Sequence, residues 1–364
     1  MTQGETTILY WGIFDPEFSR NAVYVKGLKS NGVEVIVCTD RSPGLKKYLR
    51  IIAGFWKHRK DFDMVFVGYS GHPIVPLAKL LSLILSRKPV VFDALCSFYE
   101  SNILSRDAFK SIPFRKNICR FVDFVANASA DYILVETEAQ RDYYVHTLGV
   151  TSRKCIVALT GVDDTHFYYD PAIAKSSKFT VLFRGKFTPE AGIPHILEAA
   201  QLLQNEDVAF KIIGFGWGTV ARNIEEQVKT LNLKNLEFIN TFLSMEELRG
   251  EILKSHISLG QFENHDRLNR TIPHKAFEAM AMKVPYITAR AKGIGEVLTD
   301  NVTCIFVHKA NPQDLAEKIL SLKNDTEKQK LLSDNAYAIY IKKYTPEILA
   351  RKLLGQMREN SLNT

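Results

Sequence analysis

Three ionisable residues between positions 270 and 281 have a spacing that could bind a nucleotide. Arg270 lies just before an expected helix whose first turn holds Pro273, and Lys275 and Glu278 are three residues apart, which places them on one helix face. A helix N-terminus with nearby cations is a site for an anion such as diphosphate. A carboxylate one turn further along could accept hydrogen bonds from a vicinal diol such as ribose. The competing interpretation is a capped crossover helix with an exposed Lys–Glu pair.

Two short apolar runs, at 257–260 and 284–288, flank this stretch. Each is typical of a buried strand, so the helix between them is the crossover of a strand–helix–strand unit. Terminal helices are expected at 312–321, 327–340 and 346–357, and one more is expected to begin at Gly293. Further strands are expected at 7–12, 33–38, 63–68, 89–92, 132–135, 155–157, 179–183, 208–216, 236–239 and 304–306. The sequence therefore predicts an α/β protein with parallel sheets.

A second phosphate-binding pattern follows the strand at 179–183. Gly185 and Lys186 come directly after that strand, and Gly192 precedes the helix expected at 193–203. A strand, a glycine, a cation and a helix start together make a cradle for diphosphate. Gly214, near the end of the next strand, would let a ligand approach the backbone, although glycines commonly end strands.

Three residues of the N-terminal half stand where strands and helices meet loops. Gly12 ends the strand 7–12, where a phosphate or sugar could approach the backbone, and Arg20 opens the next helix. Asp93 directly follows the strand 89–92, and ligands bind at the carboxyl ends of parallel strands. We therefore expect Asp93 to lie beside a ligand. Arg20 could reach a phosphate of that ligand, and a surface arginine at a helix start fits the pattern equally well.

Composition restricts the class of protein. The chain has 364 residues, which predicts two domains, and its 46% hydrophobic and 24% charged residues are typical of globular proteins. The five cysteines are scattered without a Cys-x-x-Cys pair, which favours reduced thiols in the cytoplasm and gives no metal signature. We expect no signal peptide and no transmembrane helix. The net charge of +7 suits anionic lipid or phosphorylated ligands, and without a nucleic-acid-binding motif we expect no nucleic-acid partner.

Two basic amphipathic stretches, at 45–60 and 108–128, fall in the N-terminal half. The first carries six lysines and arginines beside Phe55 and Trp56, and the second places Arg115, Lys116 and Arg120 among aromatic residues. Such helices can lie on an anionic membrane, which predicts peripheral binding at its inner face. The alternative is that both are core-packed helices with a solvated basic face.

Residues 260–296 resemble the donor-site segment of glycosyltransferase family 4, whose members are retaining enzymes with the two-domain GT-B fold. The resemblance rests on Glu278 followed by Ala-Met-Ala and on the Pro-Tyr-Ile run at 285–287. Many members carry two glutamates eight positions apart. This chain has Arg270 at the first of these positions, and it is similar to a subgroup with an Arg-x-Ile-Pro-(Asn/His)-Lys pattern before the second glutamate.

The resemblance implies roles for individual residues. Glu278 is expected to bind the donor ribose, with Lys275 nearby. The family usually has a second basic residue just before the later glycine, and Ala191 stands there in this chain. Arg270 and Lys186 are therefore expected to clamp the donor diphosphate and, with Asp93, to form the catalytic set. Gly12, Gly185 and Gly214 complete the expected donor-binding residues. On the acceptor side, the resemblance implies that Asp93 is the base or an orienting carboxylate and that Arg20 reaches acceptor or phosphate.

The resemblance also implies a GT-B fold, with two Rossmann-like, doubly wound domains facing each other across a cleft. The expected bounds are 1–168 for an acceptor domain, 169–178 for a linker, 179–343 for a donor domain and 344–364 for a helix crossing back to the first domain. The expected activity is retaining transfer of a hexose from a nucleotide sugar to a saccharide or lipid-linked acceptor in glycan or cell-surface polysaccharide synthesis, without a metal or other cofactor. A catalytically weak nucleotide-sugar-binding subunit and a GT-B nucleotide-sugar epimerase are the alternatives.

Overall fold

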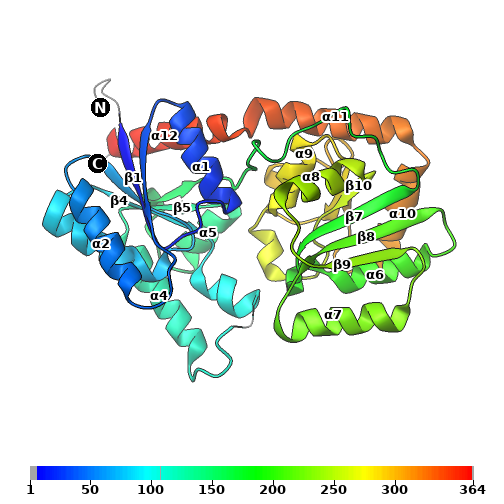
Figure 1. Ribbon diagram of the computed structural model, residues 1–364, viewed down its shortest axis with the longest axis horizontal. Coiled ribbons are helices and arrows are strands. Elements are labelled where there is room, and N and C mark those ends of the chain that lie inside the picture. The colour runs from blue at the N-terminus through cyan, green and yellow to red at the C-terminus, as the bar shows by residue number, and fades with distance from the viewer. Residues whose placement is uncertain (1–5, 107, 363–364) are drawn as a thin grey trace. The chain divides into compact units, whose positions relative to one another are not determined.

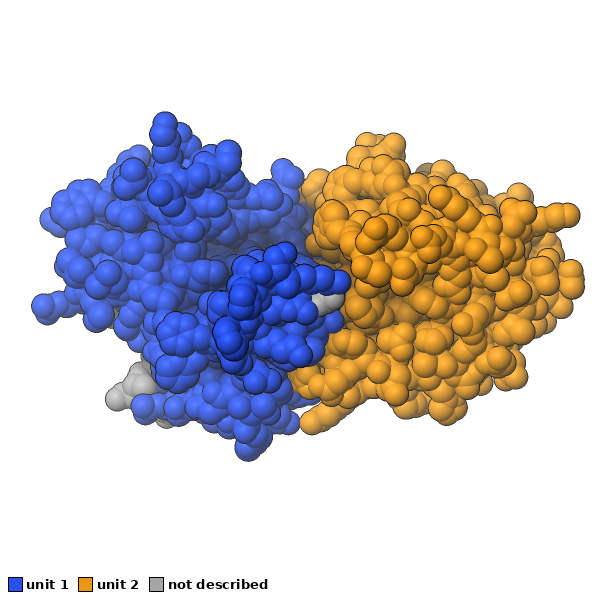
Figure 2. Space-filling view, turned by 90° about the horizontal axis from the view of Figure 1, so that it is seen from below, with its two compact units in different colours: residues 1–163, 345–364 blue, residues 164–344 orange. Residues whose placement is uncertain are grey.

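The computed structural model describes residues 6–106 and 108–362. The chain divides into two compact units, one formed by residues 1–163 with 345–364 and the other by residues 164–344 (Figure 2). Each unit contains one six-stranded sheet in which every strand pair is parallel. The expected α/β class with two Rossmann-like domains is confirmed.

The sheet of the first unit has the strand order β2-β1-β3-β4-β5-β6 (Figure 1). Its strands are β1 (Thr7–Gly12), β2 (Glu34–Thr39), β3 (Met64–Val67), β4 (Val90–Leu95), β5 (Tyr132–Val135) and β6 (Cys155–Val157). Its helices are α1 (Ser19–Ser30), α2 (Lys46–His58), α3 (Val75–Leu81), α4 (Arg115–Ser129), α5 (Glu138–His146) and α12 (Pro346–Leu362), with π-helical turns η2 (Ser82–Ser86) and η3 (Glu100–Leu104).

Alternate residues of β1 fill two different cores, as the two-residue period of a strand requires. Leu9 and Trp11 pack in the core that also holds side chains of α2, α3, α4 and α5. Ile8 and Tyr10 pack in the core that holds side chains of α1 and α12. Helices therefore cover both faces of this sheet, with α2 to α5 on one face and α1 and α12 on the other.

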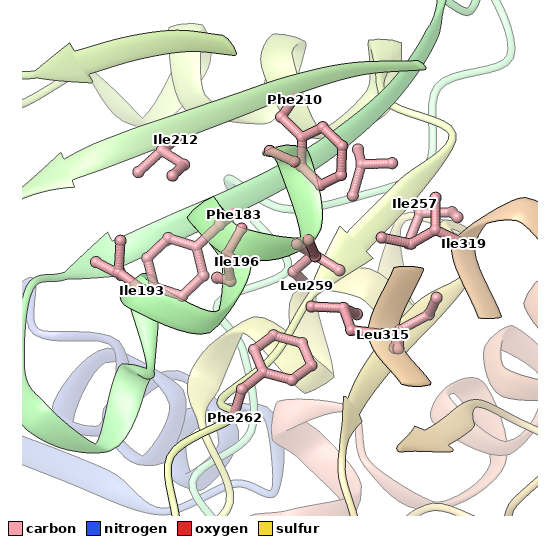
Figure 3. Close-up of a cluster of buried hydrophobic side chains, with 14 of the residues drawn as sticks. Phe183, Ile193, Ile196, Phe210, Ile212, Ile257, Leu259, Phe262, Leu315 and Ile319 are labelled. Atoms are coloured by element: carbon pink, nitrogen blue, oxygen red, sulfur yellow. The ribbon is translucent and has the colours of Figure 1, made fainter. Parts of the chain in front are cut away.

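The sheet of the second unit has the order β12-β11-β10-β7-β8-β9. Its strands are β7 (Phe179–Lys186), β8 (Val208–Phe215), β9 (Leu236–Asn240), β10 (Ile257–Leu259), β11 (Tyr286–Ala289) and β12 (Ile305–Val307). Its helices are α6 (Ile193–Leu202), α7 (Gly218–Leu231), α8 (Met245–Lys254), α9 (His274–Ala281), α10 (Pro312–Lys323) and α11 (Thr326–Lys343). Figure 3 shows its core, in which Phe183 and Phe210 of neighbouring strands pack with Ile196 of α6 and Ile319 of α10.

Helix α12 belongs to the first unit although it follows the second in sequence. It packs against α1, where a Cβ on Gly27 would lie only 2.1 Å from the carbonyl oxygen of Pro346. Ala350, Leu353 and Met357 of α12 are buried in the core that contains Ile8 and Tyr10. The first unit is therefore assembled from two separated parts of the sequence.

Several expected elements differ from those observed. The helix expected from residue 108 begins only at Arg115, because Pro113 disfavours helical backbone at the residue before it and Phe114 has a left-handed φ of 55°. The helix expected from Gly293 is a single 3-10 turn, Ile294–Glu296, and its two glycines lower helix propensity there. Residues 169–178 lie in the second unit, where Lys175 Nζ donates to the carbonyl of Ser255. No helix in the described part of the chain is long and apolar enough to cross a membrane.

Candidate functional site

The centre of the second sheet is the place where the fold predicts a ligand. The chain leaves β7 toward β8 and β9 on one side, and returns to pair β10 with the other side of β7. In open α/β sheets, ligands bind beyond the carboxyl ends of the strands at such a reversal of strand order. The carboxyl ends of β7 and β10 carry Gly185 and Gly260, and helix α9 begins in the loop region between β10 and β11.

Lys275, in the first turn of α9, fills this place. Only 7% of the residue is exposed, and its Nζ lies 3.8 Å from the centroid of the Phe183 ring. The nearest hydrogen-bond acceptor is the carbonyl oxygen of Gly260, at 3.5 Å. Among the described residues no carboxylate lies within salt-bridge distance of this ammonium group. The exposed Lys–Glu pair that the sequence also allowed is therefore absent.

Burial without a carboxylate partner makes Lys275 a destabilised cation. Burial lowers its pKa well below the usual value, the charge of Arg184 lowers it further, and Glu190 raises it in part. A phosphate group beside Nζ would reverse this balance, because an opposite charge within a few ångströms favours the charged form. The site is therefore electrostatically prepared for an anion.

Glu278, one turn further along α9, is bound to Arg184 of β7. Arg184 Nε lies 2.5 Å from Oε2, and Nη2 bonds Oε1. The residue Glu278 is 2% exposed, whereas 18% of the Arg184 side chain is exposed. The sequence placed Lys275 and Glu278 on one helix face, but the partner of the carboxylate comes from a strand 94 residues away.

Two glycines, Gly185 and Gly214, lie side by side at the ends of β7 and β8, and Gly185 borders the Lys275 ammonium group. They are register partners on β7 and β8. Gly185 has a φ of 146°, and a Cβ there would lie 3.1 Å from Lys275 Nζ. A Cβ on Gly214 would overlap the carbonyl oxygen of Gly185, at 1.8 Å. Both positions require glycine for packing, whatever the ligand, and Gly185 also borders the ammonium group directly.

Two further ion pairs lie in the loops that precede α9 and α6. Arg267 Nη1 is 2.6 Å from Glu190 Oε1, and Arg270 Nη2 is 2.7 Å from Asp266 Oδ2. Because the charge of Glu190 acts on Lys275, the pair with Arg267 lies near the same site. Sequence reasoning did not single out Arg267, since a lone arginine in a loop carries no signal.

The two cations expected to clamp a diphosphate have different neighbours. Lys186 is exposed, with Nζ 5.8 Å from the centroid of the Trp217 ring, on the β8 side of the sheet. Arg270 lies on the other side, after β10, with Asp266. Ala191, where the family resemblance placed a cation, is 1% exposed and packs in the core, so no charged side chain fits there. Their joint action on one ligand stays a prediction.

Arg20 and Asp93 form a buried ion pair in the first unit. Arg20 Nε lies 2.7 Å from Oδ1 and 2.9 Å from Oδ2 of Asp93, and Nη1 donates to the carbonyl of Ala158. The residues are 0% and 1% exposed. The surface-arginine alternative is wrong, and Asp93 has no solvent-facing surface from which to contact an acceptor. Gly12 is also buried, and a Cβ there would lie 2.7 Å from Ile74 Cδ1.

A histidine that the sequence gave no reason to select lies near the end of β4. His72 is 1% exposed, and its ring centroid is 4.8 Å from that of Phe92 and 5.5 Å from that of Phe98. Its Nε2 lies 2.9 Å from the carbonyl oxygen of Cys96 and therefore carries the proton, while Nδ1 has no partner in the described structure. Burial lowers the pKa of His72 to about 4, so the ring is neutral at pH 7.

Two other features of the described residues bear on where a ligand could bind. Among the described residues no group of three or more His, Cys, Asp or Glu side chains could hold a metal ion. A cavity of about 330 Å³ lies at the amino ends of β7, β8 and β9, the opposite edge of the sheet from Lys275. Its half-buried Lys211 is already paired with Glu237 and Glu251.

Comparison with known proteins identifies the part of the chain that holds this site. Residues 170–339 match the family model Glycosyl transferases group 1. The matched residues make up somewhat less than half of the chain, and Lys275, Arg184, Glu278 and Arg267 all lie among them. Arg20, His72 and Asp93 lie outside the matched residues.

Curated relatives of the chain are glycosyltransferases. It is 31% identical over 149 residues to an uncharacterized glycosyltransferase of Methanocaldococcus jannaschii, a match covering 41% of this chain and 39% of that protein. It is 24% identical to the poly(ribitol-phosphate) alpha-N-acetylglucosaminyltransferase of Staphylococcus aureus, over 53% of this chain and 37% of that protein. It is 22% identical to a putative colanic acid biosynthesis glycosyltransferase of Escherichia coli, over 50% of this chain and 45% of that protein. The matches span less than half the length of these relatives.

Solved structures confirm the GT-B architecture of the whole chain. HepE from Anabaena, solved with UDP and glucose, superposes with a TM-score of 0.73 at 15% identity, over 98% of this chain and 100% of that one. Sucrose-phosphate synthase from Thermosynechococcus elongatus superposes with a TM-score of 0.74 at 14% identity, over 99% of this chain and 100% of that one. At these identities the likeness concerns the fold.

Proposed function

We propose that this protein is a retaining glycosyltransferase of family 4 that moves a hexose from a nucleotide sugar to a saccharide or lipid-linked acceptor. The observation that carries the proposal is Lys275, a buried cation without a carboxylate partner at the carboxyl ends of β7 and β10. Such a cation is costly in the free protein, and a buried charge is normally paired or hydrogen-bonded. The donor diphosphate would supply the missing partner.

In this proposal Glu278 binds the ribose of the donor. Each carboxylate oxygen can accept about two hydrogen bonds, so both keep capacity after binding Arg184. The pair with Arg184 also fixes the orientation of the carboxylate. A ribose diol would then add two charge-assisted hydrogen bonds to an acceptor that is already positioned.

Catalysis would consist mainly of stabilising the leaving diphosphate. Negative charge accumulates on it as the bond to the sugar breaks, and prepositioned cations in a site with little water stabilise such charge strongly. Lys275 would be in direct contact, with Lys186 and Arg270 as outer cations. The acceptor hydroxyl would pass its proton to the departing phosphate, so the proposal requires no carboxylate base and leaves Asp93 a positioning role in the first unit.

The relatives support a particular donor and acceptor class. HepE has been solved with UDP-glucose, and the S. aureus and E. coli relatives are named for poly(ribitol-phosphate) and colanic acid. We therefore place UDP-hexoses first among donors and a cell-surface polysaccharide or its lipid-linked precursor first among acceptors.

The test is thermal shift against UDP-, GDP- and ADP-sugars, with hydrolysis of each sugar nucleotide measured in parallel. A ligand that binds only the folded state raises the melting temperature. We expect one donor class to raise the melting temperature of the native protein and to leave the melting temperature of Lys275→Met unchanged. Lys234→Met, at an exposed position before β9, is the matched control and should behave as the native protein. No shift with any sugar nucleotide, or an equal shift in Lys275→Met, contradicts the proposal.

Two further measurements separate the alternatives. Turnover should survive excess chelator, since we expect no metal cofactor, and activity that returns only with added divalent metal would refute this. Donor binding without hydrolysis or transfer would favour a nucleotide-sugar-binding subunit. Conversion of the donor to an epimer in the absence of acceptor would identify an epimerase.

A further inference from the structure

Large apolar side chains are exposed on one helical layer of the first unit. Apart from Val37, every large hydrophobic residue that is exposed in the described part of this unit lies on α2, on α3 with η2, or on α4 and the loop before it. These helices cover the same face of the sheet, the one opposite α1 and α12 (Figure 1). Representative exposures are 69% for Leu49, 69% for Ile84, 66% for Phe121 and 67% for Phe124.

The exposed side chains are not needed for folding, because each helix already buries a different face. Helix α2 buries Ile51 and Phe55, whereas Trp56 is 55% exposed. Helix α4 buries Cys119 and Ala126. The core-packed alternative to a membrane helix therefore accounts for one face of each helix and leaves the other unexplained. Large exposed apolar side chains gathered on one helical layer are typical of an interaction site.

The exposed layer is also strongly basic. No acidic residue occurs between positions 41 and 60 or between 108 and 122, while lysines and arginines are frequent in both segments. Some of these cations lie against the exposed aromatic rings: Arg59 is 4.5 Å from the centroid of Trp56. Aromatic and aliphatic side chains flanked by long cations form the composition of helices that lie in a membrane interface.

We propose that the first unit docks on an anionic lipid bilayer through the outer faces of α2, α3–η2 and α4, defined here as the docking face. The apolar side chains enter the boundary between headgroups and acyl chains, and the cations contact lipid phosphates. A second copy of the chain is a poorer occupant, because an isologous contact would bring two surfaces of the same positive charge together. An acidic protein would satisfy the charge but remains an outcome of the test.

Vesicle sedimentation tests this proposal without any sugar donor, so its result is independent of the transferase proposal. The probes are vesicles of phosphatidylcholine alone and of phosphatidylcholine with phosphatidylglycerol, at low and high salt. We expect binding only to the anionic vesicles, falling as salt rises, because screening weakens charges near a surface. Binding to neither vesicle, or equal binding to both at all salt concentrations, overturns the proposal.

Two variants of the docking face locate the contact. Phe121→Ser combined with Phe124→Ser should reduce binding at least tenfold. Leu331→Ser with Ile341→Ser, at two hydrophobic positions of α11 that are 56% and 48% exposed, should leave binding unchanged. Neutralising Lys57, Arg59 and Lys60 to Gln should reduce binding about a hundredfold, at about fivefold for each cation. The same change at exposed Lys229, Lys234 and Lys342 of the second unit is the charge-matched control.

The remaining outcomes also decide the question. Equal losses in the control and docking-face variants would show a nonspecific charge effect and overturn the proposal. Sedimentation equilibrium without lipid measures self-association. A dimer abolished by Phe121→Ser with Phe124→Ser, in a protein that ignores vesicles, would assign the face to a second copy of the chain instead.

Discussion

Arg184 and Glu278 are bonded through both oxygens of the carboxylate, with Nε 2.5 Å from Oε2 and Nη2 bonding Oε1. The pair joins the central strand β7 to the helix α9 that carries Lys275. Because Glu278 is almost fully buried, removing Arg184 would leave an uncompensated charge, which costs far more than the intact pair contributes.

The first prediction concerns this pair. Glu278→Ala and Arg184→Ala should each destabilise the second unit by up to about 3 kcal/mol, the lower end for a broken buried pair because Arg184 is partly exposed. The double variant should lose clearly less than the sum of the two, with a coupling of at least about 1 kcal/mol. Urea unfolding of the four proteins measures the cycle, and additive losses would show that the two side chains act independently.

The ribose assignment predicts a separate effect of Glu278→Ala on ligand affinity. Donor binding should weaken by about 1–3 kcal/mol, the scale of hydrogen bonds to a charged group. Calorimetric titration measures the affinity for two ligands. One is the intact sugar nucleotide, and the other is the diphosphate sugar that lacks the nucleoside. Only the nucleotide should lose affinity, and an equal loss for both would place Glu278 at the sugar or phosphate instead.

A third prediction is that Lys275→Met stabilises the free protein while removing donor binding. Replacing a buried, unpaired ammonium with an apolar side chain of similar length relieves its desolvation cost, and a gain of about 0.5–2 kcal/mol is typical of stabilising substitutions. Thermal unfolding without ligand measures the gain. A variant that is less stable than the native protein would indicate that Lys275 has a structural role in α9.

A second measurement of this third prediction counts protons, because donor binding should be coupled to proton uptake through Lys275. Its pKa lies well below the usual value in the free protein and should rise beside a phosphate, so the complex binds more protons than the free protein. Calorimetry at alkaline pH in buffers of different ionisation enthalpy counts these protons. Uptake that persists undiminished in Lys275→Met would assign the proton to another group.

The fourth prediction distinguishes a positioning role of Asp93 from a catalytic one. Asp93→Asn should destabilise the first unit by about 3–5 kcal/mol, because Arg20 remains buried without a counter-charge. Turnover per folded molecule, measured well below the lowered melting temperature, should fall less than tenfold. A folded variant that has lost turnover by several orders of magnitude would restore Asp93 as the acceptor-side base.

The fifth prediction uses the lowered pKa of His72, about 4 against about 6.5 in an unfolded chain. Between these values the unfolded state binds more protons, so stability rises with pH and is lost as pH falls from about 6.5 toward 4. Over about 2.5 pH units this amounts to roughly 3 kcal/mol. His72→Gln lacks this loss, so the stability difference between the two proteins should shrink toward acid. A constant difference in urea midpoint would mean that His72 titrates normally.

Several strands could be predicted from the sequence because they are largely buried and read as continuous apolar runs. The expected bounds 7–12, 132–135 and 155–157 are those of β1, β5 and β6. The residues at which helices begin were harder to predict. At α4 the decisive signal was Pro113 rather than the periodicity of the residues after Ala108. The ordering of strands in each sheet follows from parallel crossovers of fixed hand.

The site could be predicted only where its residues are neighbours in sequence. The three-residue spacing of Lys275 and Glu278 placed them on one face of α9, as observed. Nothing local indicates that Arg184 crosses 94 positions to bind Glu278, or that Lys275 is buried against Phe183. Likewise, the buried state of Asp93 and Arg20 depends on a contact across 73 positions that no spacing rule contains.

The late position of α12 has a consequence for how the chain is made. A ribosome releases β1 and α1 before α12, yet the core that holds Tyr24 and Leu28 of α1 cannot be completed until α12 has been synthesised. The second unit is continuous in sequence, so its core can close while the first still waits. Domains usually fold in the order of their synthesis. Here the unit begun first would be completed last, and its unpaired helix face is the surface that chaperones would have to shield in the interval.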